Sequence, residues 1–156
     1  MRKRSSYRPK PQLPNPVAWI INGFKPVSAA GIVNVQIKNH NAIDALRKGV
    51  ANREDIDTII EALNIAEALQ RLGIGDEYKD ELREAQDALY AVSKRGVDRE
   101  YRFVLRAREL TAINLGMEIH DAQIEVTTIE KLEKAMDIVT SEIKNRRARV
   151  IMERTT

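Results

Sequence analysis

The residues of this sequence best suited to metal or acid–base chemistry are its only two histidines, His40 and His120. A histidine that binds a metal or moves a proton needs a second ligand or a carboxylate that faces it. On a helix, Asp44 lies one turn after His40, whereas Glu118 and Asp121 point in other directions than His120. The sequence has no HExxH or HxxxH spacing and no cysteine. We therefore expect two structural histidines, no metal site and no cofactor.

Four carboxylates gather in one short stretch, where they could act as a pair of catalytic acids. They are interspersed with Lys79 and Arg83, which is typical of an exposed, salt-bridged helix surface. The sequence has no GxSxG nucleophile motif, and its LGIG turn lacks the GxxxxGK[ST] pattern of a phosphate-binding loop. These observations predict that the protein is not an enzyme. The four carboxylates are Glu77, Asp80, Glu81 and Glu84.

Basic side chains collect near the two ends of the sequence, although 26 Lys and Arg against 23 Asp and Glu leave a net charge of only +3. Arginine and lysine attract phosphate, and tyrosine can stack on a base. Four prolines block a helix before residue 17. The sequence therefore predicts an extended, basic, Pro-rich arm at residues 1–16, which either stays solvated or orders on a protein or nucleic-acid partner. The candidate partner- or anion-binding residues of the two ends are Arg2, Lys3, Arg4, Tyr7, Arg8, Arg146, Arg147 and Arg149.

A third candidate site is the charged connection at residues 97–108, in which Tyr101 and Arg102 are adjacent. Arginine offers a planar donor fork to a phosphate, and tyrosine offers a stacking surface. Alternatively, Tyr101 and Phe103 fold beneath the helices and leave the arginines in solvent. Tyr101 and Arg102 are thus candidate anion-binding residues with a structural alternative.

The segments that must position these candidates show helical periodicity. Residues 109–126 carry two apolar rows, so we expect this helix to lie at the centre of the protein with both sides covered. The first row is Leu110, Ile113, Met117 and Ile124, and the second is Leu115, Ile119, Ala122 and Val126.

Two of the other expected helices lie before residue 74. Residues 28–48 alternate briefly like a strand, but we expect them to be mainly helical and to end at Gly49 as a C-terminal cap. Asn52 is a good N-cap, and Asp55 three residues later resembles the second member of a capping box. The apolar face that follows runs to Gly73.

Two more helices complete the prediction. Asp76 is expected to cap a helix that ends at Gly96, and Thr127 or Thr128 is expected to cap the last one. The fold class is therefore all-α: a compact bundle of about five helices at residues 17–156, preceded by the extended arm at residues 1–16.

Two of these helices carry heptad-like apolar seams. There are two interpretations of these seams. They belong to the intramolecular core, or one of them pairs with a second copy of the chain; we expect a homo-oligomer. Residues 17–24 contain Trp19, the only tryptophan, and are expected to anchor the arm onto the helices or a neighbouring subunit. The seams are Tyr78, Leu82, Ala85, Leu89 and Val92, and Ile129, Leu132, Met136, Val139 and Ile143.

Three segments, RKRSSYRPKP, IKNHNAIDALRKG and FVLRARELTAINLGMEIHDAQIE, together resemble an uncharacterised family of short proteins encoded by tailed phages and prophages of proteobacteria. The resemblance implies a protein made in the cytoplasm of a bacterial host, and it brings no catalytic or cofactor-binding residue with it. No apolar run approaches the roughly 18 residues of a membrane span, so no membrane association is expected.

Small phage proteins without enzymatic motifs often act by binding. We therefore expect a non-enzymatic protein that binds a host protein and modulates a host process, such as host takeover or evasion of antiviral defence. One alternative is a sponge that sequesters a nucleotide immune signal, and another is a nucleic-acid-binding protein.

Overall fold

The computed structural model describes residues 25–145, and in this range the chain is all-α, as expected. It forms five α-helices and one turn of 3₁₀-helix. The described range contains no strand, only an isolated β-bridge between Pro26 and Thr128. The helices are α2 (Ala29–Arg47), α3 (Arg53–Arg71), α4 (Lys79–Asp98), α5 (Ala107–Val126) and α6 (Ile129–Lys144), with η1 (Asp76–Tyr78) before α4.

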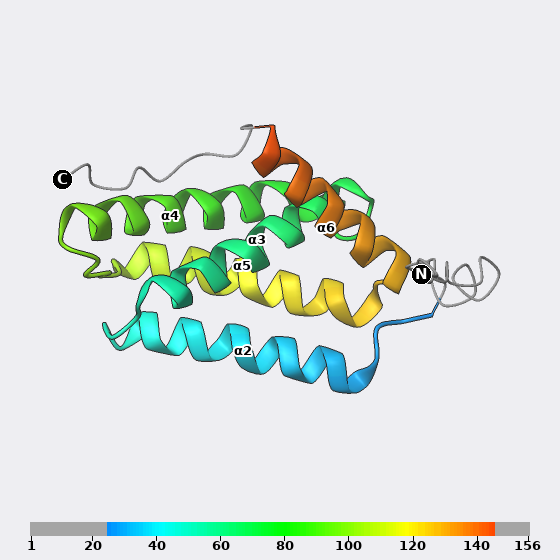
Figure 1. The fold of residues 1–156 in the computed structure, drawn as a ribbon, viewed down its shortest axis with the longest axis horizontal. Helices are drawn as coiled ribbons and strands as arrows, with labels where there is room; N and C mark the ends of the chain where they lie inside the picture. The colour runs from blue at the N-terminus through cyan, green and yellow to red at the C-terminus, as the bar shows by residue number, and fades with distance from the viewer. Residues whose placement is uncertain (1–24, 146–156) are drawn as a thin grey trace, which may run out of the picture.

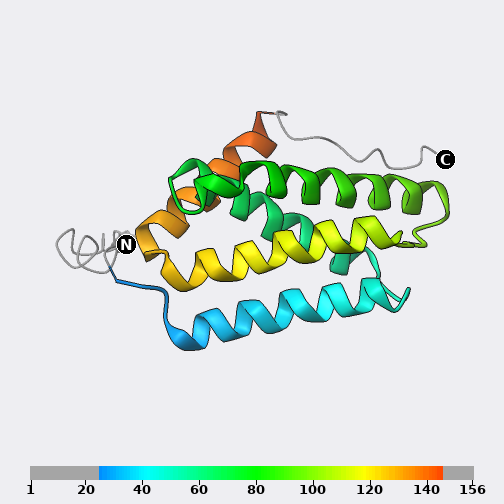
Figure 2. The same ribbon diagram turned by 180° about the vertical axis from the view of Figure 1, so that it is seen from behind.

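The five helices form two layers (Figures 1 and 2). Helices α2, α5 and α4 lie side by side along the long axis, and α3 and α6 cross one face of this layer. Helix α3 packs against all four others, whereas α5 packs against α2, α3 and α4. The prediction that residues 109–126 form the central helix was therefore only partly right, because α3 is the helix that every other helix contacts.

Helix α5 also differs from the prediction that both of its apolar rows are covered. Ile113, Met117 and Ile124 of the first row are buried. In the second row Ile119 is buried, but Leu115 and Val126 are exposed. The second buried side of α5 consists instead of small and polar residues, which let α3 and α4 approach closely: Ala112, Gly116, His120 and Gln123.

The predicted helix starts are correct where a side chain closes a local hydrogen bond. Ser28 accepts from the Gly31 amide, and Asn52 and Asp55 form a reciprocal capping box. Thr128 accepts from the Lys131 amide at the start of α6. Such caps involve neighbours in sequence, so they do not depend on the tertiary structure.

Two predicted boundaries of α4 were wrong. Asp76 lies in η1, and α4 begins three residues later at Lys79. Gly96 does not end the helix, which continues to Asp98; it lies inside the last turn, where its missing side chain makes room for the ring of Phe103. A glycine is therefore required at residue 96 by packing against Phe103 and not by the end of the helix.

The two predicted seams differ in how much of each is buried. Leu82, Ala85, Leu89 and Val92 of α4 are buried in the core, although Tyr78 is exposed. In α6 the only buried residue is Ala135, and Met136 and Ile143 of the predicted seam are exposed.

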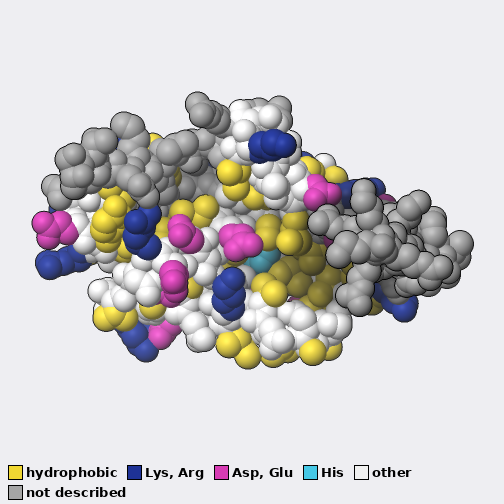
Figure 3. Space-filling model, in the orientation of Figure 1, with side chains coloured by type: hydrophobic (Ala, Val, Ile, Leu, Met, Phe, Trp, Pro, Cys, Tyr) yellow, Lys and Arg dark blue, Asp and Glu magenta, His cyan; other side chains and the backbone are white. Residues whose placement is uncertain are grey.

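Hydrophobic side chains also line the lower edge of the face in Figure 3, where α2 runs.

Candidate functional site

Within the described chain, α3, α4 and α6 enclose a groove of about 710 Å³. Helix α3 provides its floor, and the facing sides of α4 and α6 provide its walls. The groove exists because α4 and α6 both pack on α3 without closing over it. Its apolar lining is Ile60, Leu63, Ala68, Leu89, Tyr90, Ile138, Val139 and Ile143.

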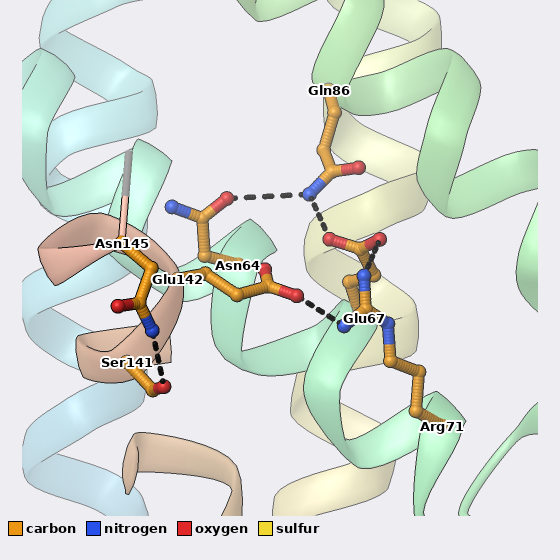
Figure 4. Close-up of polar contacts among 7 residues, drawn as sticks. All are labelled: Asn64, Glu67, Arg71, Gln86, Ser141, Glu142 and Asn145. Atoms are coloured by element: carbon orange, nitrogen blue, oxygen red, sulfur yellow. Dashed lines mark hydrogen bonds and ion pairs between the residues drawn. The ribbon is translucent and has the colours of Figure 1, made fainter. Parts of the chain in front are cut away.

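Polar side chains of three helices meet along this groove (Figure 4). Gln86 of α4 donates from Nε2 to Asn64 Oδ1 at 3.3 Å and to Glu67 Oε2 at 3.1 Å, both on α3. Arg71 donates to Glu67 Oε1 at 3.1 Å and, with its other terminal nitrogen, to Glu142 of α6. The network therefore joins α3 to both of its neighbours.

Arg71 is the centre of this network. Its guanidinium lies between two carboxylates, one a turn earlier on α3 and one on α6. The hydrogen bond to Glu142 is the main reason that the pKa of Arg71 lies above its ordinary value, and the nearby charge of Glu67 adds to the effect. Because two carboxylates bind the guanidinium and offset its charge, Arg71 positions α6 and attracts an anion less than an unpaired arginine would.

A second hollow of about 220 Å³ adjoins the groove and shares Glu67, Arg71, Arg83 and Gln86 with it. Its remaining lining residues, Gln70 and Lys79, are also polar. Neither Lys79 nor Arg83 forms an ion pair within residues 25–145. Two uncompensated positive charges at a polar hollow can attract an anion.

The candidate residues of the two ends, Arg2, Lys3, Arg4, Tyr7, Arg8, Arg146, Arg147 and Arg149, lie outside the described residues, as do Trp19 and the whole arm. The domain boundary at residue 16 therefore remains a prediction.

The Tyr101–Arg102 candidate does not line the groove. Phe103 is buried, and Tyr101 packs partly buried against the main core. The guanidinium of Arg53 lies 4.8 Å from the centre of the Tyr101 ring, so one face of this ring is already covered by a cation. Arg102 is exposed. This arrangement agrees with the structural alternative for Tyr101 and Phe103.

The two histidines have different surroundings. The Nε2 of His40 lies 2.6 Å from Asp121 Oδ2 on α5, and Asp44, one turn after His40, pairs instead with Arg47 and Lys48. His120 is 1% exposed, and desolvation lowers its pKa to about 4, so it is neutral at pH 7.

The carboxylates at residues 77–84 do not form the expected salt-bridged surface. Within residues 25–145, none of Glu77, Asp80, Glu81 and Glu84 is paired with Lys79 or Arg83. No group of three or more His, Asp or Glu side chains in the described part of the chain could hold a metal ion. No helix of that part is long and apolar enough to cross a membrane.

Sequence reasoning missed the groove itself. Two signals in the sequence could have indicated it. One is the apolar seam of α6, and the other is the polar stripe Asn64, Glu67 and Arg71 beside apolar residues of α3. Comparison with protein-family models, with curated proteins and with solved structures finds no match to this chain.

Proposed function

We propose that this chain is a non-enzymatic binding protein, encoded by a tailed phage or prophage, that modulates a host process by binding a host protein in the groove between α3, α4 and α6. The phage origin and the host process, takeover or evasion of antiviral defence, rest on the sequence resemblance. The bacterial host cytoplasm as its location rests on the same resemblance.

The groove is the observation that supports binding. Its volume is about 710 Å³, and all three helices line it with both apolar and charged side chains. A concave surface with apolar and charged side chains suits an amphipathic helix, whose apolar anchors recur at i, i+3 or i+4 and i+7. A host segment of this kind is the partner that the chemistry of the groove favours.

The test compares two aspartate variants in affinity purification from host lysate, with native mass spectrometry of the eluted complexes. Ile143→Asp places a charge on the groove, and Val126→Asp places the same charge on an apolar side chain outside it. Ile143 is 60% exposed and Val126 is 73% exposed, so both variants should fold. A host protein retained by wild type and Val126→Asp but lost by Ile143→Asp supports the proposal, whereas equal retention by both variants contradicts it.

Two further experiments address the other parts of the expectation. Deletion of residues 1–12 should weaken partner binding if Arg2, Lys3, Arg4, Tyr7 and Arg8 act as an accessory arm, and unchanged binding would remove this role. Native mass spectrometry of the protein alone tests the expected homo-oligomer.

The polar hollow beside the groove favours the nucleotide sponge as a second candidate function. Lys79 and Arg83 offer positive charge there. A cyclic dinucleotide should then raise the melting temperature of wild type and not that of Arg83→Glu. No shift in wild type would exclude this ligand. Binding of nucleic acid by the basic ends would show instead as a steep loss of affinity between low and moderate salt.

A further inference from the structure

The wall that α6 contributes to the groove is incompletely covered by the described chain. Helix α6 has 16 residues and one buried side chain, Ala135. Ile138 and Val139 are half-buried at the groove, and Ile143 is exposed there. Apolar side chains that line an open groove lose hydrophobic stabilisation, so a segment that covers them would be favoured.

The chain leaves α6 at the groove. Glu142 and Ile143 line it, and the stretch 146–156, RRARVIMERTT, begins three residues after Ile143. Eleven residues can span up to about 36 Å when extended, so this stretch is long enough to follow the groove in either direction. Residues 17–24 are the other apolar stretch outside the described range, but Lys25 enters at the opposite end of α6, where its carbonyl accepts from the Ile129 amide.

The composition of this stretch complements the groove. Val150, Ile151 and Met152 form an apolar run that follows Arg149 and precedes Glu153 and Arg154. Four arginines against one glutamate give residues 146–156 a net charge of +3. The groove lining has three carboxylates, Glu67, Asp87 and Glu142, against two arginines, Arg71 and Arg83, which gives a net charge of −1.

From the position, the apolar match and the opposite charges, we infer that residues 146–156 bind in the groove of their own chain. Val150, Ile151 and Met152 contact the apolar side chains of the groove lining, and the positive charge of the stretch complements the net negative charge of the lining. The inference concerns the same groove as the proposed function, and a partner that uses the groove must first displace this stretch. It is tested without any partner, so either idea can fail while the other stands.

The first experiment measures the stretch as a separate peptide. A labelled peptide of residues 146–156 is titrated into a variant that ends at Asn145 and into the full chain, with fluorescence anisotropy as the readout. The peptide should bind the shortened chain at least about tenfold more tightly, because an attached segment competes at a high effective concentration. Equal affinity for both chains, or no binding to either, overturns the inference.

Matched variants locate the binding site on the shortened chain. Ile143→Lys should abolish peptide binding, because it places a positive charge in the groove against a peptide of net charge +3. Val126→Lys should leave binding unchanged, since Val126 is also exposed but does not line the groove. A shortened chain that also lacks residues 1–24 should bind the peptide as tightly. If deletion of residues 1–24 alone opens the groove to the peptide in the full chain, the occupant is the other end and the inference is wrong.

The second experiment distinguishes the same chain from a second copy. The sequence has no cysteine, so pairs of introduced thiols report contacts without background. Asp87→Cys in the groove is combined in turn with Val150→Cys, Ile151→Cys and Met152→Cys, and Val126→Cys replaces Asp87→Cys in the control series. Mild oxidation should give a disulfide-bonded monomer in at least one groove pair. Covalent dimers, or oxidation no faster than in the control series, overturn the inference.

Discussion

The ring of Phe103 lies directly against the backbone of Gly96, in the space that a side chain at residue 96 would occupy. Phe103 follows a tight turn in which Glu100 and Tyr101 both have positive φ values, 58° and 64°. The turn brings the chain back over the last turn of α4, and Phe103 joins the main core. The contact between this aromatic ring and the glycine therefore helps to hold the end of α4 against the connection to α5, together with the Tyr101 amide, which donates to the Gly96 carbonyl at 2.7 Å.

Gly96→Ala should destabilise the protein, although alanine is the better helix former. The added Cβ overlaps the Phe103 ring, and such overpacking costs about 1–3 kcal/mol of unfolding free energy. Urea denaturation measures the effect. The double variant Gly96→Ala/Phe103→Ala is the control, because it should be less destabilised than the sum of the two single variants. Strict additivity would show that the two residues do not contact each other.

Glu109→Gln should lower the unfolding free energy at neutral pH. It should also make the unfolding free energy decrease less than that of wild type as the pH is lowered. Arg95 donates to both carboxylate oxygens of Glu109, at 2.8 Å and 2.6 Å, with side chains only 23% and 12% exposed. This hydrogen bonding lowers the pKa of Glu109 below 4.5. A lowered folded-state pKa gives stability that is complete above about pH 4.5 and lost as the pH falls below it.

We expect a loss of about 1–3 kcal/mol for Glu109→Gln at pH 7, measured by urea denaturation, and a smaller difference from wild type at pH 3. Glu130→Gln removes a more exposed i,i+4 pair with Lys134 and should cost under about 0.5 kcal/mol. A loss for Glu109→Gln that is the same at pH 3 and pH 7 would show that its charge is not responsible.

His120 should make stability depend on pH between about 6.5 and 4. Burial lowers its folded-state pKa to about 4, so in this range the unfolded chain takes up a proton that the folded chain does not. The unfolding free energy should therefore fall by roughly 2–4 kcal/mol as the pH decreases from 6.5 to 4. His120→Gln should remove this slope, and Glu109→Gln should retain it down to about pH 5. If the unfolding free energy of His120→Gln depends on pH as steeply as that of wild type, groups other than His120 cause the dependence.

Gln123→Glu should destabilise the contact between α5 and the end of α3. The buried Gln123 amide donates from Nε2 to the carbonyl oxygens of Ala66 at 3.0 Å and Ile74 at 2.8 Å. An ionised glutamate has no donor for these carbonyls and adds a buried charge, so we expect a loss of at least about 3 kcal/mol.

Gln123→Met is the control for the contact of Gln123, because it keeps the volume, leaves the two carbonyls without a donor and adds no charge. It should cost about 1–3 kcal/mol. Thermal unfolding at pH 7 compares the three proteins. Unchanged stability of Gln123→Met would contradict the role of the amide donor, and a smaller loss for Gln123→Glu than for Gln123→Met would contradict the cost of the buried charge.

The sequence by itself determined the features that depend on neighbours along the chain. The capping box of Asn52 and Asp55, the end of α2 before Gly49 and the apolar seam of α4 all follow from hydrogen bonds or periodicity within one helix. These interactions form between residues three or four positions apart, so their geometry is the same in any tertiary context. This is why the all-α fold class could be predicted.

Only the tertiary structure decided which faces are covered and which charges meet. Arg71 reaches Glu142 across 71 positions, and His40 reaches Asp121 across 81, in preference to the closer Asp44. The central position of α3, the exposed row of α5 and the groove beneath α6 follow from the way the helices cross, and helical periodicity shows that a face is apolar without showing what covers it. The groove is therefore a property of the assembled layers, because its lining comes from three helices that are separate in the sequence.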